Sequence, residues 1–283
     1  IDPNSSTTTS TTSGPIDPNS STTTSTTSGP IDPNTSTTTT TTIPNYDRSY
    51  AVIQTVPGYY FSHDSGIRAN GQPGGFNKNQ VTVIKIIDVL KDGTEIERTD
   101  VDKNNINFNG ATPNSAYNAR THIEGQATIT DFKYDIPVYY GSMALTDKSG
   151  APLTVPAYIG VKGDVSLDNL VNAVDASAVL KYYAQTQTNG QTGDDVICTT
   201  IGSGLEVTSP LDELDQLAAF LGDVTENEWG EDNWKLRKTD RTLDAVDASN
   251  ILAFYAERQR SDNDGVSDYD LWNGVLGDKR FGN

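Results

Sequence analysis

The sequence predicts a multi-domain protein that consists of a disordered linker, a β-sandwich and an all-α domain, in that order. Three observations carry this prediction. Residues 1–48 are rich in Thr, Ser and Pro and nearly lack bulky apolar side chains, residues 49–162 alternate apolar and polar positions, and residues 163–283 place apolar side chains at helical spacing. A chain of 283 residues is long enough for one large domain or two ordinary ones.

The linker is a tandem repeat. The block IDPNSSTTTSTTSGP occupies residues 1–15, recurs at 16–30 and returns in altered form from Ile31. Such a repeat is too polar to bury apolar surface, and its prolines favour extended backbone. It is typical of spacers in extracellular polysaccharide-degrading systems. The sequence shows neither a basic, apolar leader nor a run of 18 apolar residues. We therefore expect a soluble, secreted protein whose leader was removed, or a fragment.

The negative charge is concentrated in the C-terminal part. Residues 163–283 hold 23 acidic against 9 basic residues, a net charge of −14, out of −18 for the whole chain. Such a surface repels nucleic acid and anionic membranes, so neither is an expected partner. Hard divalent cations are the natural counter-ions of clustered carboxylates. The single cysteine, Cys198, excludes an intramolecular disulfide framework and a cysteine-based metal site.

Residues 49–162 predict short strands in an antiparallel β-sandwich of immunoglobulin-like size. The expected strands are Ala51–Val56, Gln80–Leu90, Glu95–Val101, Gln126–Tyr134, Ile136–Tyr140 and Leu153–Val161, with a turn at Lys91-Asp92-Gly93 and no helix. A structural role is the main interpretation of this domain. The alternative is a carbohydrate-binding face formed by exposed aromatic residues, for which Tyr59, Tyr60 and Phe61 are the candidates.

Residues 163–283 predict a small helical domain. Apolar side chains recur at helical spacing in three segments, Val171–Tyr183, Leu214–Leu221 and Ala248–Tyr255. The strand segment ends only two residues before this domain, so we expect the two domains to pack on one another. Leu271 and Trp272 are expected to dock the C-terminal segment onto the core.

The segment Asp164–Asp175 has the spacing of a twelve-residue calcium loop. Oxygen-bearing side chains occupy positions 1, 3, 5, 9 and 12 of this loop, namely Asp164, Ser166, Asp168, Asn172 and Asp175. At position 7, Leu170 offers its backbone carbonyl. Position 6 requires a positive φ, which Asn169 tolerates. The alternative is an acidic turn that caps a helix through Asp175 or Ser177.

A second copy of this pattern is interrupted. Both copies begin with GDV and close with AVDAS, but Asp223–Asp247 spans 25 residues, which is a twelve-residue loop with an insert of thirteen. Loop closure across such an insert is tolerable because its entropic cost grows only logarithmically. The expected ligands are Asp223, Thr225, Asn227, Asp244 and Asp247, so the sequence predicts two Ca²⁺ ions in all. A merely structural acidic hairpin is the alternative, and Asp262–Asp264 is a weaker third candidate.

Twin loops that each run into a similar helix resemble the dockerin module of cellulosomes. The chain from Ser49 to Asn283 resembles an X-module plus dockerin pair of the type found at the C-terminus of ruminococcal scaffoldins and cellulose-binding proteins. The sandwich part of the resemblance rests on the strings Asp135–Tyr140 and Tyr158–Asp164, and the C-terminal part on Leu271-Trp272 and Gly277-Asp278. The family has a long insert in its second loop, as here.

The resemblance implies a non-catalytic, extracellular assembly module that binds a cohesin on a cell-surface anchoring scaffoldin and is stabilised by the X-module. It would tether a polysaccharide-degrading polypeptide to the bacterial surface and be monomeric before binding. The implied cohesin contacts are Ala173, Val174, Leu180, Lys181 and Gln185, and in the repeat Ala245, Val246, Leu252, Ala253 and Glu257. The alternative is that Leu180 and Leu252 belong to the intramolecular core. Because the insert breaks the symmetry of the two copies, a single binding orientation is expected.

Overall fold

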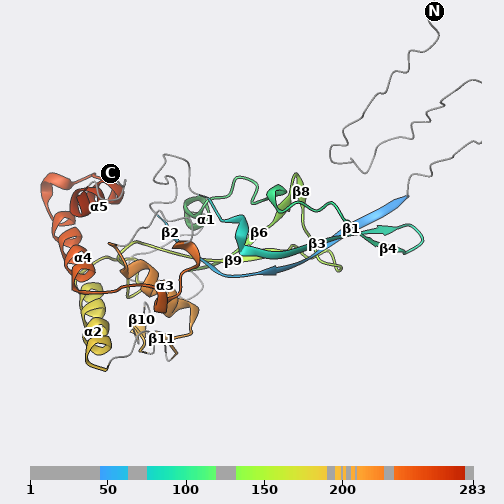
Figure 1. Cartoon of the computed structure of the whole chain (residues 1–283). Coiled ribbons are helices and arrows are strands. Elements are labelled where there is room, and N and C mark those ends of the chain that lie inside the picture. The colour runs from blue at the N-terminus through green and yellow to red at the C-terminus, as the bar shows by residue number, and fades with distance from the viewer. Residues whose placement is uncertain are drawn as a thin grey trace, which may run out of the picture.

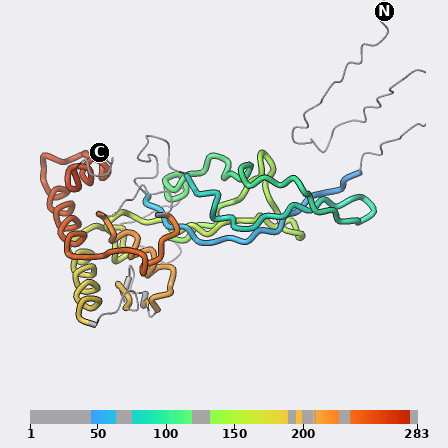
Figure 2. The backbone as a smooth tube through the Cα atoms, in the orientation of Figure 1, coloured from blue at the N-terminus to red at the C-terminus, as the bar shows by residue number. Residues whose placement is uncertain are grey.

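The computed structural model describes residues 45–62, 75–118, 132–189, 195–198, 200–201, 205–207, 209–225 and 233–277. Within these ranges the molecule is elongated: a narrow arm of strands leads into a block of helices (Figure 1). The backbone trace in Figure 2 shows the same arrangement without the ribbons. Strand β1 (Tyr46–Thr55) begins at the tip of the arm, and helix α5 (Asp268–Leu276) lies in the helical block. The predicted linker lies outside the described residues up to residue 44, and β1 begins three residues before the predicted sandwich.

The arm is a three-stranded antiparallel sheet in the order β1-β3-β4, with β3 at Val81–Leu90 and β4 at Glu95–Glu97. The strands predicted at residues 51–56 and 80–90 are confirmed with shifts of a few residues, whereas the strand predicted from Glu95 ends at Glu97. The turn predicted at residues 91–93 joins β3 to β4. Gly93 has a φ of 86° there, a conformation that glycine adopts without a steric cost.

The strands nearest the helices form a mixed sheet in the order β2-β9-β6, with β2 at Gly58–Phe61, β9 at Thr154–Gly160 and β6 at Lys133–Pro137. Strand β9 pairs parallel with β2 and antiparallel with β6. The expectation of purely antiparallel pairing is therefore wrong for β2. A third small antiparallel sheet joins β5 (Ile106–Asn107), β7 (Tyr139–Tyr140) and β8 (Met143–Ala144).

Two further expectations for this region need correction. Strand β6 runs through Asp135, where the sequence predicted a break between one strand ending at Tyr134 and another beginning at Ile136. The first part of the earlier predicted strand, residues 126–131, lies outside the described residues. A short helix, α1 (Pro113–Asn118), is present where no helix was expected. Thr112 caps it by accepting a hydrogen bond from the backbone of Ser115 at 3.1 Å, an interaction too local to produce a helical period.

One apolar core joins the three sheets. Ala51 and Ile86 come from the arm sheet, Ile136 and Val155 from the mixed sheet, and Ile106 from the third sheet. The sheets are small, and no barrel is present in the ranges that the structure describes. An immunoglobulin-like sandwich stays a prediction.

The C-terminal block contains the helices α2 (Ala173–Asn189), α3 (Glu213–Gly222) and α4 (Ala245–Arg258) in addition to α5. All three predicted helical segments are thus confirmed. The block also carries a two-stranded hairpin of β10 (Thr200–Ile201) and β11 (Leu205–Glu206), so it is not entirely helical. Short 3₁₀ helices occur along the chain at Lys78–Gln80 (η1), Lys103–Asn105 (η2), Asn233–Lys235 (η4), Lys238–Asp240 (η5) and Ser261–Asn263 (η6).

Helices α2, α4 and α5 share a core in which α2 packs along α4 and α5 closes over α4. The Trp272 ring of α5 stacks on Phe254 of α4, with centroids 4.2 Å apart. Leu271 and Trp272 are both buried, which confirms that this segment docks on the core. Ser267 starts α5 by accepting a hydrogen bond from Asp270 N–H at 3.1 Å.

The strand region and the helical block share a second apolar core. Tyr59 and Phe61 of β2 lie against Phe220 and Leu221 of α3, and the Phe61 and Phe220 rings stack at 4.3 Å. Gly160 allows this approach, because a side chain there would place its Cβ 2.5 Å from a Leu221 methyl. The two parts of the chain therefore pack directly on each other.

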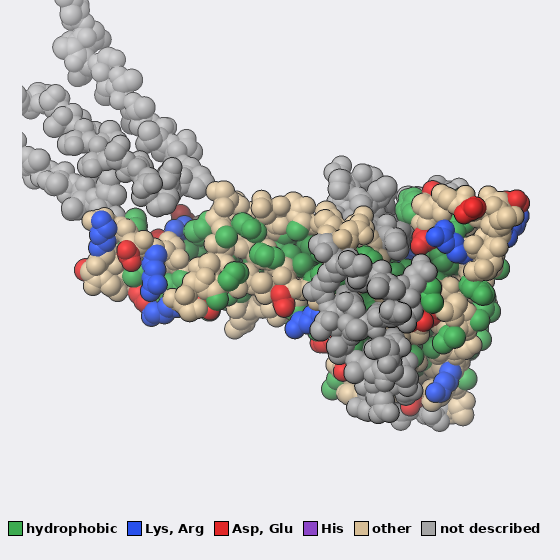
Figure 3. All heavy atoms as spheres, turned by 180° about the vertical axis from the view of Figure 1, so that it is seen from behind, with side chains coloured by type: hydrophobic (Ala, Val, Ile, Leu, Met, Phe, Trp, Pro, Cys, Tyr) green, Lys and Arg blue, Asp and Glu red, His purple; other side chains and the backbone are tan. Residues whose placement is uncertain are grey.

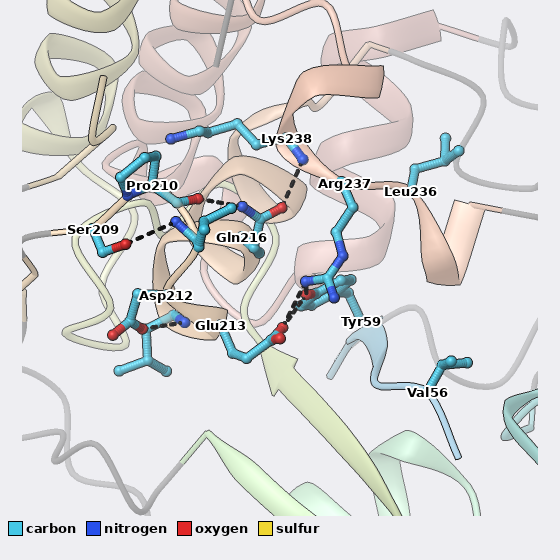
Figure 4. A network of polar contacts seen from close by, with 12 residues as sticks. Val56, Tyr59, Ser209, Pro210, Asp212, Glu213, Gln216, Leu236, Arg237 and Lys238 are labelled. Atoms are coloured by element: carbon cyan, nitrogen blue, oxygen red, sulfur yellow. Dashed lines mark hydrogen bonds and ion pairs between the residues drawn. The ribbon is translucent and has the colours of Figure 1, made fainter. Parts of the chain in front are cut away.

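A polar network lies beside this apolar contact (Figure 4). Arg237 Nη1 donates to the Tyr59 hydroxyl at 2.7 Å and to Glu213 Oε2 at 2.9 Å, and Tyr59 also donates to Glu213. Burial, followed by the Glu213 contact, raises the pKa of Tyr59, which keeps this hydroxyl a donor. Trp234, in the same insert as Arg237, is buried in the core of the three sheets. The insert of the second loop thus fastens the helical block to the strands.

Candidate metal loops and partner-binding face

The first predicted loop folds around two buried carboxylates. Asp164 Oδ1 accepts a hydrogen bond from Asp168 N–H at 3.0 Å, and its Oδ2 accepts one from Asn169 N–H at 2.8 Å. From the other end, Asp175 accepts hydrogen bonds from Ser166 N–H and Asn172 N–H, both at 2.8 Å. Asp164 and Asp175 are both 0% exposed. The backbone of the loop is therefore wrapped around positions 1 and 12 of the predicted pattern.

Two residues of this loop adopt left-handed backbone. Asn169 has a φ of 64°, as predicted for position 6, and Leu167 has a φ of 53°, which was not predicted. This conformation costs a residue with a Cβ about 1–2 kcal/mol. Leu167 is fully buried in the core shared by the strands and α3, and the apolar surface that it buries offsets this strain.

The two carboxylates are unfavourable as bare charges. Burial, with the charges of Asp175 and Asp168 adding to it, raises the pKa of Asp164 well above its usual value. Burial likewise raises the pKa of Asp175 to about 6, against the backbone donors that lower it. Two ionised carboxylates in one buried loop require a positive charge between them. A hard cation with oxygen ligands would supply that charge.

These shifts predict a pH dependence. An aspartate whose pKa is higher in the folded state than in the unfolded chain binds its proton more tightly when folded. The metal-free protein is therefore expected to gain stability as the pH falls through about 6, the pKa of Asp175, and to lose it as the pH rises. The helical far-ultraviolet dichroism that the calcium-free protein retains, at about pH 5 and about pH 7.5, measures this, because a less stable helical block unfolds further.

The comparison variant for this experiment is Asp175→Asn, which should reduce the dependence over this range. Asp164, Asp215 and Asp247, whose pKa values burial also raises, account for what remains. Asp88 and Asp147 have lowered pKa values, so their contributions change only at more acidic pH. With calcium present the trend should reverse, because protonation competes with the metal. A metal-free protein that is more stable at the higher pH contradicts the interpretation.

The residues of the first loop fit a calcium ion. The Ser166 hydroxyl, at position 3, is buried next to the Asp175 carboxylate, so both groups could contribute oxygen atoms to one ion. Asp168 and Asn172 use side-chain oxygens to accept backbone hydrogen bonds from Leu170 and Val174, at 2.9 and 2.7 Å; carboxylate and amide oxygens retain further lone pairs for a metal. In the described ranges no three acidic, His or Cys side chains are close enough to hold a metal alone. In a calcium site here, hydroxyl, amide and carbonyl oxygens would have to complete the coordination shell.

The C-terminal half of the second loop has the same hydrogen-bond pattern as the C-terminal half of the first. Asp247 accepts hydrogen bonds from Val224 N–H at 3.0 Å, from the Thr225 hydroxyl at 2.8 Å and from Asp244 N–H at 3.0 Å. Asp244 caps α4 by accepting from Val246 N–H at 2.6 Å, as Asn172 accepts from Val174 in the first loop. Burial raises the pKa of Asp247. The structure thus brings Thr225, Asp244 and Asp247 together. Asp223 directly precedes Val224, whose N–H donates to Asp247, and Asn227 lies outside the described residues.

The opening half of the second loop contains a cation of its own. Arg241 Nη1 lies 3.2 Å from Asp223 Oδ2, and both side chains are 1% exposed. The guanidinium also lies over the Phe220 ring, 4.9 Å from its centroid. This ion pair was not predicted from the sequence. Because Asp223 already has a positive partner, the second loop fits calcium less directly than the first, and its occupancy stays a prediction.

The predicted partner-binding residues lie at matching places on α2 and α4. Four of them are exposed apolar side chains with similar exposure in the two copies: Val174 is 62% and Val246 57% exposed, and Leu180 and Leu252 are each 42% exposed. The alternative that Leu180 and Leu252 belong to the core is therefore wrong. Ala173, Lys181 and Ala245 are also exposed, and Gln185, Ala253 and Glu257 are half-buried. Glu257 accepts hydrogen bonds from Arg260 and Asn263.

The three aromatic residues named for the carbohydrate alternative are not exposed, so the expectation that they form a binding face is wrong. Tyr59, Tyr60 and Phe61 are 1%, 8% and 8% exposed, because the helical block and the sheet core cover both faces of β2. Viewed from behind, apolar side chains are scattered along the arm and charged side chains gather at its tip (Figure 3). A hollow of about 430 Å³ is lined in part by Phe76, Phe108 and Asn107. Asn107 already donates to Gly141 O at 2.8 Å, so its amide is committed to the fold.

Comparison with known proteins assigns no family. No protein-family model matches the chain, and no curated protein matches it. Among the helices that the structure describes, none combines the length and the apolar character needed to cross a bilayer.

Proposed function

We propose that the chain is a non-catalytic, calcium-dependent docking module of the dockerin type. Its partner is a cohesin on a cell-surface anchoring scaffoldin, and its role is to tether an extracellular, polysaccharide-degrading polypeptide to the bacterial surface. The observation that carries this proposal is the duplicated face of α2 and α4, where equivalent apolar residues stay exposed beside equivalent acidic loops. Calcium is proposed for both loops. The strand region acts as a stabilising X-module.

The shape of the molecule suits this role. Strand β1 begins at the tip of the arm, and α2 and α4 lie in the block at the opposite end (Figure 1). A partner bound to these helices is therefore held away from the start of β1. Exposed apolar residues at matching positions are typical of a protein-binding surface, because water contact disfavours them in the free protein.

Calorimetric titration against a panel of cohesins, with calcium and with chelator, tests the proposal. We expect at least one cohesin to bind with calcium and none to bind with chelator. Equal binding under both conditions contradicts the role of calcium, and no binding to any cohesin in the panel contradicts the partner. Cellulose pull-down of the chain provides a separate check on direct carbohydrate binding.

Substitution of the exposed leucines locates the face. Leu180→Glu and Leu252→Glu each place a charge where an apolar side chain is buried on binding, and the double variant should weaken cohesin binding by a factor of about 30 or more, as for an interface hot spot. The matched control is Leu211→Glu, since Leu211 is 82% exposed and lies outside this face. If the chain binds cohesin in a single orientation, one of the two single variants should weaken cohesin binding much more than the other. Equal effects would favour two orientations, and a double variant that binds like the control contradicts the assignment of the face.

A further inference from the structure

A hydrogen bond from the strand region reaches into the first loop. The Tyr117 hydroxyl, on α1, donates to Asn169 Oδ1 at 2.8 Å, across 52 residues of sequence. Tyr117 is 6% exposed, and its ring belongs to the core of the three sheets. Asn169 is the residue that turns the loop through a φ of 64°, and its backbone N–H donates to Asp164. The hydroxyl thus holds the side chain of the turning residue from outside the loop.

Apolar contacts hold the loop from the same side. Leu167 is buried among Tyr59, Phe132 and other residues of the core shared with α3. Val171, two residues after Asn169, packs against both the sheet core and the helical core. The matching carboxylate of the second loop, Asp247, receives its hydrogen bonds from Val224, Thr225 and Asp244, within the helical block. The Tyr117 hydrogen bond and these apolar contacts are thus made to the first loop.

We propose that Tyr117 is a positioning residue for the first loop, and that its hydrogen bond to Asn169 pre-shapes the loop for a divalent cation. This inference rests on the proposed calcium function. Two buried carboxylates in one loop repel each other when no cation lies between them, so a metal-free loop tends to open. A contact made from the rigid strand region resists that opening. Calcium binding then requires less ordering of the first loop, and the smaller entropic cost raises the affinity of the loop for calcium.

Tyr117→Phe removes only the hydroxyl. We expect this variant to bind calcium about fivefold more weakly at the first loop, the effect of one neutral hydrogen bond, and with unchanged affinity at the second loop. Calcium titration followed by amide resonances separates the loops. The reporters are Asp168 and Asn169, whose N–H groups donate to Asp164, and Val224 and Thr225, whose N–H groups donate to Asp247.

Two further variants distinguish positioning from general stability. Tyr140→Phe is the matched control, because the Tyr140 hydroxyl accepts a hydrogen bond from Asp102 N–H at 3.0 Å in the strand region; it should leave both calcium affinities unchanged. Asn169→Gly keeps a residue that tolerates positive φ but removes the amide that Tyr117 contacts. In that background Tyr117→Phe should have no further effect. Asn169→Gly also tests the same bond if Tyr117→Phe does not fold.

The outcomes separate this inference from the proposed function. A wild-type chain whose first-loop amides do not respond to calcium overturns both. A wild-type chain that binds calcium while Tyr117→Phe binds it equally well overturns the positioning role alone. An equal loss of affinity at both loops, or a full effect of Tyr117→Phe in the Asn169→Gly background, also overturns it, because both results indicate general destabilisation.

Discussion

Removal of calcium with EGTA is expected to unfold most of the helical block and to leave the strands in place. Helices α2 and α4 begin where the first and the second loop end. The first turn of each helix contains a buried carboxylate, Asp175 in α2 and Asp247 in α4. Without a cation, Asp164 and Asp175 must be protonated or separated, and either change disturbs the start of α2. Helix α5 packs on α4 through Trp272, so it should be lost with α4. The free energy of calcium binding then contributes directly to the free energy of folding of the helical block.

Two optical signals distinguish the parts of the molecule. The helical far-ultraviolet dichroism should fall on chelation and return with excess calcium, while the strand contribution persists. Trp272 reports on the helical core and Trp234 on the sheet core, so Trp234→Phe and Trp272→Phe variants assign the fluorescence change. We expect the change to follow Trp272. Unchanged dichroism after chelation contradicts the prediction, and simultaneous loss of the strand signal indicates that the two parts unfold as one unit.

The first loop could be predicted from the sequence because its contacts are local. Asp164 and Asp175 are eleven residues apart and bind backbone groups that lie between them, so the ligand spacing alone specifies the turn. The helices could be predicted for the same reason, since each carries its own apolar period. The left-handed Leu167 could not, because only burial against β2 and α3 makes that conformation favourable for a bulky side chain.

The insert of the second loop could not be placed from its sequence. Trp234, one of its two tryptophans, enters the core of the three sheets, and Arg237 binds Tyr59, 178 residues away. From the sequence, the insert could be identified only as thirteen additional residues in the second loop. One signal in β2 was available and was misread: three successive aromatic residues, Tyr59, Tyr60 and Phe61, leave no polar face, which indicates a strand buried on both sides.

The insert also supplies a buried ion pair whose disruption should have a large effect. Lys238 Nζ donates to Asp215 Oδ2 and to Asp195 O, and the Lys238 and Asp215 side chains are both 0% exposed. The ammonium group also lies over the Tyr182 ring of α2, 5.4 Å from its centroid. Burial raises the pKa of Asp215, and the Lys238 contact opposes that shift. Lysine and carboxylate therefore compensate each other inside the helical block.

Lys238→Met keeps the length of the side chain and removes its charge. We expect it to lower the free energy of unfolding of the helical block by about 3–5 kcal/mol, because it leaves the Asp215 carboxylate buried without its partner. Urea unfolding of the calcium-bound chain, followed through Trp272, measures the loss. Lys235→Met is the matched control: Lys235 is an exposed lysine of the same insert, and its replacement should change stability by no more than about 0.5 kcal/mol.

The double variant Asp215→Leu with Lys238→Met shows whether the effect comes from the unpaired charge. Replacing both members of a buried pair by apolar side chains removes the desolvation cost of two ions, so it should restore much of the stability lost in Lys238→Met. Asp215 Oδ1 also accepts a hydrogen bond from Ile197 N–H at 2.7 Å, and the loss of this bond limits the recovery. Lys238→Met with the stability of the Lys235 control contradicts the prediction. A double variant less stable than Lys238→Met would instead show that the hydrogen bonds of Asp215 outweigh the cost of burying its charge.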